Sequence, residues 1–274
     1  MLSSVHAIAR RVLVGAGTAA LVLSALPAAV AAQDGGADTA TNDLDELIAL
    51  NQQAWNEDAD LVREVYAADA VHTATFYDRT DVHEGVEAIA GVAAMEGTIN
   101  AVAPRVDIPA AAGYRWAGFS DSAGGTVCLW RAFDGRIERH DCLLSANGSE
   151  SRPPAGLADG SGAAAIDEIL VRLTPAWGGG LEDLEALEAV YAPDAVHTVR
   201  FLNRTMRYEG PEAIYAVARN GEPFGFIGDR VEFEAPAGEL AWAQANDIMG
   251  GTVCLFRARE GMITRHDCLL PVAG

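Results

Sequence analysis

The sequence predicts an α+β protein built from two tandem domains, each with helices first and an antiparallel-rich sheet after them. Two observations lead to this prediction. The segment VYAADAVHT at residues 65–73 returns as VYAPDAVHT at residues 190–198, and residues 124–144 return almost unchanged at residues 250–270. A repeat of roughly 110 residues is a whole domain, not a solenoid unit. In each copy helical periodicity precedes strand-like alternation, which is typical of an α+β fold.

Three helices are expected in the first copy. Leu44, Leu47 and Ile48 recur at helical spacing behind acidic residues, so a helix begins at Asn42. A short second helix covers residues 58–66. A third helix covers residues 86–95, directly after the Glu-Gly pair that precedes it.

The rest of the first copy has the alternation of β-strands. Strands are expected at residues 70–76, 105–108 and 114–119, followed by a hairpin of residues 126–133 and 136–144. The hairpin turns at Asp134-Gly135, a pair that favours tight turns. The second copy repeats this order, with helices from Ala164, at 181–191 and at 211–219, and strands up to Leu270.

The domain boundaries follow from composition. Arg10 and Arg11 precede an apolar run at residues 12–26 and small residues at 28–32, which is the pattern of a cleaved signal peptide. We therefore expect a signal peptide at 1–32, a disordered lead-in at 33–42, domain 1 at 43–146, a linker at 147–162 and domain 2 at 163–274. The protein is then secreted, with no membrane segment after cleavage.

The charge of the chain excludes several classes of partner. The net charge is −20 and the isoelectric point is about 4.5, whereas binding to nucleic acid or to an anionic membrane needs clustered basic residues. All 19 basic residues are arginines. Without lysine, Schiff-base chemistry and a lysine general base are excluded.

The repeated motifs resemble those of the NTF2-like superfamily, and within it the SnoaL-like branch. The resemblance is carried by the YA-x-DAVHT segment, the EG-x-EAI helix start and the closing hairpin, and it covers both copies. It implies two tandem cones, each a curved sheet wrapped around about three helices and enclosing a largely apolar pocket. The superfamily includes isomerases, cyclases, epoxide hydrolases, dehydratases and non-catalytic binding domains, so the resemblance indicates a fold more than an activity.

The resemblance also allows one mechanism to be tested by register. In ketosteroid isomerases a catalytic aspartate follows the corresponding motif by a few residues. The same step leads here to Ala74 and Val199, the helix tyrosine would fall near Leu50, and the strand acid near Leu129. None of these groups is present, so that mechanism is not carried over.

Strand alternation indicates which repeated residues can share each pocket. By resemblance to the isomerases His72 faces the pocket, and the face of the last strand that carries His140 and Cys142 is the pocket wall; Cys128 and Trp130 share this face if the hairpin has a three-residue loop. The candidate catalytic residues are His72, His140, His197 and His266. The alternative is that each is a buried histidine bonded to a backbone carbonyl or to Tyr66. The expected pocket residues are Tyr66, Phe76, Trp130 and Leu144 in the first copy, and Tyr191, Phe201, Phe256 and Leu270 in the second.

Three interpretations of the cysteines compete. In an exported protein an even number of cysteines favours disulfides, and residues opposite or diagonal on paired strands can form them, which pairs Cys128 with Cys142 and Cys254 with Cys268. Alternatively, the cysteines and the pocket histidines form a Cys2His2 metal site, with residue types that suit zinc but a spacing that matches no zinc motif. The third interpretation is buried free thiols. We adopt the disulfides and expect neither metal nor cofactor.

The outward residues of the hairpins indicate how the two copies pack. Arg131, Arg139 and Asp141 form a salt-bridge lattice that we expect at the surface. In the superfamily this sheet face often makes the dimer, so the set is expected to meet Arg257, Arg265 and Asp267. The duplication would then be a covalent pseudo-dimer.

Three functions follow as hypotheses. The first is binding of a small hydrophobic molecule, with His72 and His197 fixing its polar end. The second is a cofactor-independent isomerase, cyclase or hydratase that uses the pocket histidines as general acid and base. The third is a protein-interaction domain whose pockets are filled by side chains.

Overall fold

The computed structural model describes residues 37–96, 105–149, 156–177, 184–219 and 225–273. The expected signal peptide at 1–32 and most of the lead-in lie outside these residues. The described part forms two units, the first up to residue 149 and the second from residue 156.

The first unit contains helices α1 (Ala37–Asn56), α2 (Val62–Val65) and α3 (Val86–Glu96). Its strands are β1 (Tyr66–Thr75), β2 (Thr80–Glu84), β3 (Val106–Ile108), β4 (Tyr114–Ser120), β5 (Thr126–Phe133) and β6 (Arg136–Leu144). They form one sheet of order β2-β1-β6-β5-β4-β3.

The second unit repeats this plan with α4 (Ala163–Ala176), α5 (Leu184–Glu188) and α6 (Gly210–Ala218). Its strands are β7 (Tyr191–Arg200), β8 (Thr205–Glu209), β9 (Phe226–Phe233), β10 (Glu239–Asn246), β11 (Thr252–Arg259) and β12 (Met262–Leu269). The sheet order, β8-β7-β12-β11-β10-β9, is the same.

The predicted fold class, α+β in two tandem units, is confirmed. Each sheet has six strands, and its helices cover one face. All strand pairs are antiparallel except β1 with β6 and β7 with β12, which run parallel. The parallel pair places the repeated DAVHT segment beside the repeated RHDCLL segment, so these two repeated stretches are direct neighbours in each sheet.

The structure also differs from the sequence prediction in its details. Strands β2 and β8 were not predicted, and β1 begins at Tyr66 rather than at residue 70. Helix α1 begins at Ala37, five residues before the predicted start, within the segment that we expected to be a disordered lead-in. The end of the predicted linker is ordered as well, because Leu157 forms a bridge with Phe233 on β9.

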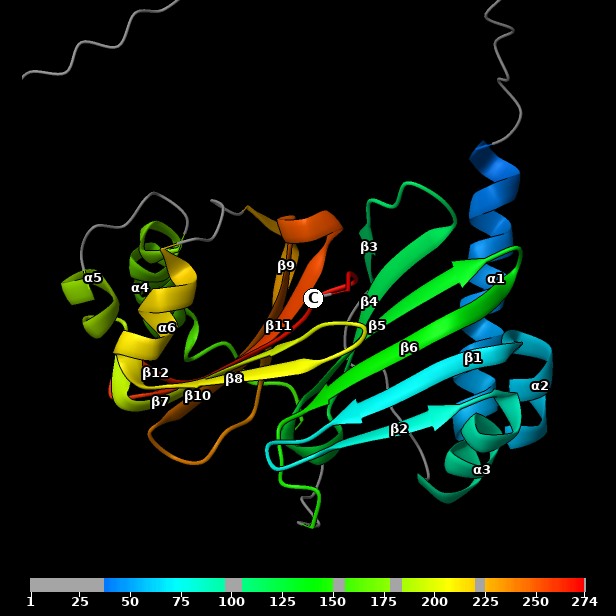
Figure 1. The fold of residues 1–274 in the computed structure, drawn as a ribbon, viewed down its shortest axis with the longest axis horizontal. Helices are drawn as coiled ribbons and strands as arrows, with labels where there is room; N and C mark the ends of the chain where they lie inside the picture. The colour runs from blue at the N-terminus through cyan, green and yellow to red at the C-terminus, as the bar shows by residue number, and fades with distance from the viewer. Residues whose placement is uncertain (1–36, 97–104, 150–155, 178–183, 220–224, 274) are drawn as a thin grey trace, which may run out of the picture.

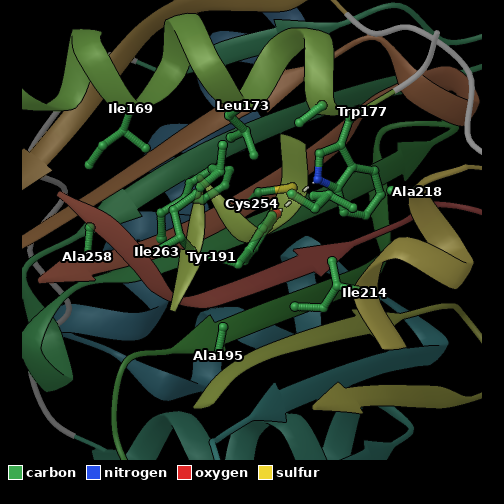
Figure 2. Packing of buried hydrophobic residues seen from close by; sticks show 14 of the residues in the cluster. Ile169, Leu173, Trp177, Tyr191, Ala195, Ile214, Ala218, Cys254, Ala258 and Ile263 are labelled. Carbon is green, nitrogen blue, oxygen red and sulfur yellow. Dashed lines mark hydrogen bonds between the residues drawn. The ribbon is translucent and has the colours of Figure 1, made fainter. Parts of the chain in front are cut away.

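The inner face of each sheet packs against its own helices. In the second unit this core combines Ile169 and Leu173 of α4 with Tyr191, Trp242 and further residues of the sheet, all of them buried. Figure 2 shows Leu173 and Trp177 above the sheet, with the indole nitrogen of Trp177 turned towards Tyr191. The first unit has a matching core beneath α1 and α3.

The outer faces of the two sheets pack against each other. One buried apolar cluster contains Phe119, Val127 and Leu129 from the first unit together with Phe233 and Leu255 from the second. The helices of the two units consequently lie at opposite ends of the molecule, with both sheets between them (Figure 1). Within the part of the chain that the structure describes, no helix combines the length and the apolar character needed to cross a membrane.

Candidate functional site

Two histidines meet at the centre of each unit. The parallel pairing of β1 with β6 sets His72 directly beside His140, and their ring centroids lie 4.5 Å apart. In the second unit His197 and His266 are paired in the same way, at 4.4 Å. All four side chains are buried. Because neighbouring residues in register point to the same side of a sheet, all four rings face the inner side.

One ring nitrogen of His72 is held by the backbone. Its Nδ1 lies 2.9 Å from the carbonyl oxygen of His140, and the Nδ1 of His197 lies 2.7 Å from that of His266. A carbonyl oxygen only accepts, so each Nδ1 carries the hydrogen and each Nε2 carries a lone pair. Both Nε2 atoms are buried and have no hydrogen-bond partner among the described residues. Each histidine pair therefore presents one unpaired acceptor.

A buried tyrosine orients the second histidine. The Tyr66 hydroxyl accepts from Trp55 Nε1 at 2.9 Å, donates to Asn51 Oδ1 at 2.8 Å, and lies 3.0 Å from His140 Nδ1. A hydroxyl has a single hydrogen, and here it goes to Asn51. His140 Nδ1 is therefore the donor in the third contact, and its Nε2 is left with a lone pair.

The second unit has a different hydrogen-bond pattern at the same place. Tyr191 accepts from Trp177 Nε1 at 2.9 Å and lies 2.8 Å from His266 Nδ1. Leu173 of α4 lies in this core, and no asparagine contacts Tyr191 within the described residues. The hydroxyl hydrogen is then available to His266 Nδ1, which favours the tautomer with hydrogen on Nε2. The two units thus favour opposite tautomers of the same histidine.

Burial keeps all four imidazoles neutral near pH 7. It lowers the pKa of His72 and of His197 to about 4 each, although the bond from Nδ1 to the backbone carbonyl partly opposes this. It lowers the pKa of His140 and His266 well below the ordinary value, and the neighbouring histidine lowers each further. Burial also raises the pKa of Tyr66 and Tyr191, so both hydroxyls stay protonated.

The cysteines form the expected disulfides. Cys128 is bonded to Cys142 and Cys254 to Cys268, each pair directly opposite on its hairpin with Cα atoms 4.1 Å apart. None of the four cysteines is free. The disulfides lie beside the histidines, since the Sγ of Cys142 is 3.1 Å from His140 Nε2 and the Sγ of Cys268 is 3.0 Å from His266 Nε2.

The second unit encloses an apolar cavity of about 370 Å³ against this cluster. His197, His266 and the Cys254–Cys268 disulfide form part of its wall. The rest of the wall is mainly apolar and includes Trp177, Val199, Phe201, Val217, Phe256 and Leu270. Asn246, Thr252 and Tyr208 add polar atoms. The described residues thus bring apolar surface and two imidazoles together around one space.

The corresponding space in the first unit is much smaller. A cavity of about 90 Å³ lies between α1 and the sheet, and Trp55, Cys128, Trp130 and His140 form part of its wall. Trp130 occupies the position of Phe256 and stacks on both Trp116 and His140. The larger indole fills space that the phenyl ring leaves open. The two units therefore share the histidine cluster but not the cavity.

The expected pocket residues are only partly found on the cavity walls. Phe201, Phe256 and Leu270 line the cavity of the second unit, and Trp130 lines that of the first. Tyr66 and Tyr191 do not, because they lie fully buried behind the histidines. Phe76 and Leu144 are not among the residues around the smaller cavity either. The tyrosines thus contact histidines instead of lining these cavities, and the assignment of Phe76 and Leu144 to a pocket wall stays a prediction.

Most of the outward arginines and aspartates are largely buried, whereas Arg131, which pairs with Glu138, stays partly exposed. The side chains of Arg139 and Asp141 are 13% and 7% exposed and pair with each other at 2.6 Å, and Arg265 pairs with Asp267 at 2.7 Å. These ion pairs stay within their own units. Of this set, Arg257 makes the most contacts across the boundary, to the Tyr77 hydroxyl at 3.0 Å and to the Gly124 carbonyl at 2.8 Å. Burial of these pairs between two sheets explains the difference from the expected surface lattice.

Sequence reasoning missed two members of the cluster. The indoles of Trp55 and Trp177 contact both histidines of their units edge-on, at centroid distances of 5.1–5.4 Å. His83 on β2 stacks on His72, and Tyr208 occupies the same place against His197. A signal was present for the tryptophans, because each precedes the repeated motif by a similar distance. For His83 the repeat gave only weak support, because Tyr208 stands in its place in the second copy.

No protein-family model matches the chain, and no curated protein matches it. Solved structures do match the chain, and each covers about one unit of it. An NTF2-like protein of unknown function from Silicibacter pomeroyi shares 14% identity, covers 41% of this chain and 98% of its own, and has a TM-score of 0.31. A SnoaL-like family protein from Agrobacterium tumefaciens shares 16% identity over 38% and 99%, with a TM-score of 0.29. An NTF2-like superfamily protein from Salmonella enterica shares 12% over 42% and 98%, with a TM-score of 0.30.

Proposed function

We propose that this protein is exported and binds a small hydrophobic molecule with a hydrogen-bond donor in the cavity of its second unit. The cavity of about 370 Å³ carries this proposal. Binding sites for small molecules are typically mainly apolar spaces of roughly 300–1,000 Å³ with a few placed polar groups. The smaller space in the first unit lies below that range.

The chemistry of the polar end follows from His197. Its Nε2 is a neutral, buried acceptor without a partner, on a side chain that forms part of the cavity wall. A ligand hydroxyl or N–H group would satisfy it, and leaving it unpaired costs about 1–3 kcal/mol. A carboxylate would bring a charge and no donor into an apolar space, which is unfavourable. The preferred ligand is therefore neutral and donor-bearing.

The enzymatic alternative has one observation in its favour. The imidazoles of His197 and His266 are close enough, at 4.4 Å between centroids, to reach a single substrate. Their low pKa weighs against it, because a general base works best when its pKa lies near the working pH. Binding without catalysis therefore remains the preferred function. An interaction domain with filled pockets fits the first unit better than the second.

Export rests on sequence and disulfides. The predicted signal peptide lies outside the described residues, and two disulfides are compatible with an extracellular protein. N-terminal sequencing of protein collected outside the cytoplasm should start near Gln33. Recovery of the full-length chain only inside the cell would contradict export.

The binding proposal can be tested with a neutral probe that has a donor, N-phenyl-1-naphthylamine. The oxidised protein should bind one probe per chain with a saturating rise in fluorescence. Val199→Phe places a ring inside the cavity and should reduce affinity at least tenfold. The matched control is Val171→Phe on α4, where the native side chain is 74% exposed, and it should bind normally. Equal binding by both variants would show that the probe binds elsewhere.

A further inference from the structure

We propose that each unit contains a His2Cys2 site for Zn²⁺ that forms when its disulfide is reduced. This goes beyond ligand binding and does not depend on it. The ligands would be His72, His140, Cys128 and Cys142 in the first unit. In the second they would be His197, His266, Cys254 and Cys268.

The ligand atoms already lie close together. In each unit one atom from each histidine and one cysteine sulfur all lie within 4.8 Å of one another. The fourth ligand is adjacent, because the sulfurs of Cys128 and Cys142 are bonded to each other. Zn²⁺ bonds of about 2.0–2.3 Å in a tetrahedron place neighbouring ligand atoms roughly 3–4 Å apart. Reduction lets the two sulfurs separate to that spacing without moving the histidines.

The histidines have the outer hydrogen bonds of metal ligands. A metal-binding imidazole usually donates its other N–H to a carbonyl or another acceptor, which fixes the lone pair towards the metal. His72 does so through Nδ1 to the His140 carbonyl, and His140 through Nδ1 to the Tyr66 hydroxyl. The Nε2 atoms of both histidines are then available to bind the metal. The Nε2 of His72 has no hydrogen-bond partner among the described residues. Nothing in a disulfide alone requires this arrangement.

Charge also favours the site. Two thiolates and two neutral imidazoles around Zn²⁺ have a net charge of zero, and a buried core accepts a neutral group far more readily than a charged one. In the second unit the hydrogen of His266 has to move from Nε2 to Nδ1 first. The site in the first unit is therefore the better prepared of the two.

The redox step needs an external dithiol as the reductant. Thiol–disulfide exchange breaks the Cys128–Cys142 bond, adds two hydrogens to the sulfurs and converts the dithiol into a disulfide. Zn²⁺ then displaces both thiol protons to the solvent. Oxidation reverses the sequence and releases the ion, so the disulfide and the metal site are alternative states of the same residues.

Cobalt substitution tests the proposal on the full chain. After reduction and removal of the reductant under anaerobic conditions, the protein should bind two Co²⁺ ions. Both should give tetrahedral visible bands and thiolate charge-transfer absorption, and Zn²⁺ should displace them. The oxidised protein should give neither signal. Absence of both signals from a reduced protein that retains its near-ultraviolet circular dichroism would overturn the proposal, as would equal binding by the oxidised protein.

Variants identify the ligands. His72→Ala and His197→Ala should each lower the stoichiometry from two Co²⁺ ions to one, and the untouched unit reports that the chain is still folded. His83→Ala is the control, because His83 is a histidine that stacks on His72 but lies outside the ligand cluster, and it should still bind two. Two tetrahedral ions in the His72→Ala variant would refute the assignment. Naphthylamine binding to the oxidised protein is measured without metal. The ligand-binding proposal and the metal-site proposal are therefore tested independently.

Discussion

The four buried histidines determine how the protein responds to acid. Each is buried against an indole and against its partner histidine, and each has a lowered pKa. In the unfolded chain a histidine has a pKa near 6.5. Between the two values the unfolded state binds more protons than the folded state, so protonation favours unfolding in that range.

The free energy of unfolding should therefore fall as the pH decreases from 6.5 towards 4. Each histidine contributes a slope of up to about 1.4 kcal/mol per pH unit within this window. Urea unfolding at pH 7.0 and 5.5 measures the effect before most carboxylates are protonated. The variants His72→Gln and His197→Gln should each have a smaller slope. A free energy of unfolding that is the same at both pH values would contradict the low pKa values.

The two tyrosines offer a comparison within one chain. Tyr66 has three side-chain partners, Trp55, Asn51 and His140, whereas Tyr191 has two, Trp177 and His266. Tyr66→Phe should therefore destabilise the protein by about 1 kcal/mol more than Tyr191→Phe, which is the usual contribution of one hydrogen bond. Denaturant unfolding of both variants gives the difference. A larger loss from Tyr191→Phe would show that the Asn51 contact contributes nothing.

At this scale the sequence was informative only within strands. Alternation along β6 placed His140 and Cys142 on one face, because the register of a strand fixes its side-chain directions, whereas the resemblance supplied the inward direction of His72. The contact of Trp55 with both rings was not predictable, since it depends on how α1 crosses the sheet. A bond between Tyr66 and a histidine was among the expected alternatives. Alternation could not decide between that bond and a place on the pocket wall, because alternation shows a face and not the depth of a side chain within the core.

At the level of elements, the hairpins are the best predicted parts. Residues 126–133 and 136–144 were predicted as strands with a turn at Asp134-Gly135, and β5 and β6 have these bounds. Strands β2 and β8 were missed because they lie at the sheet edge and are largely polar, with Thr80, Asp81, His83 and Glu84 in β2. An edge strand has one neighbour and little burial, so it shows no strong alternation.

The disulfides lock the predicted hairpins, and the two should contribute equally. Each closes a segment with a sequence separation of 14 residues. A loop of that length corresponds to about 3 kcal/mol of stabilisation. The double variant Cys128→Ala/Cys142→Ala and its counterpart in the second unit should each lose about that amount in denaturant unfolding with a chelator present. No loss in either variant would mean that strand pairing alone holds the hairpin.

At the scale of the whole molecule, the duplication turns the outer face of each sheet into an interface between the two units. The outer face of each sheet carries Val127, Leu129 and Leu143, or Val253, Leu255 and Leu269, which would be exposed in a single unit. Contiguous apolar surface of this kind needs a partner, and here the other unit provides it. The sequence could not show that Arg139 and Asp141 are largely buried, because their burial also depends on the second unit, where the Leu202 carbonyl accepts a hydrogen bond from Arg139.

Two glycines allow the interface to close. Gly125 lies against Phe233 and Gly251 against Ile108. At each of these glycines the missing side chain leaves room for a side chain of the other unit. A Cβ at Gly251 would lie 1.8 Å from Ile108 Cγ2, and the backbone there has φ +104. At Gly135, where φ is +71, nothing lies within 4 Å of the same Cβ. An alanine is strained by the backbone at both positions, but it clashes at only one.

Gly251→Ala should therefore destabilise the protein more than Gly135→Ala, by about 1–3 kcal/mol, the usual cost of overpacking a core. The excess should come from the interface, so we expect calorimetry to resolve two unfolding transitions in Gly251→Ala. The wild type and Gly135→Ala should each unfold in one transition, because the shared apolar cluster couples the units. Equal stabilities for the two variants would mean that the sheets move apart at no cost, and that their packing does not couple the units.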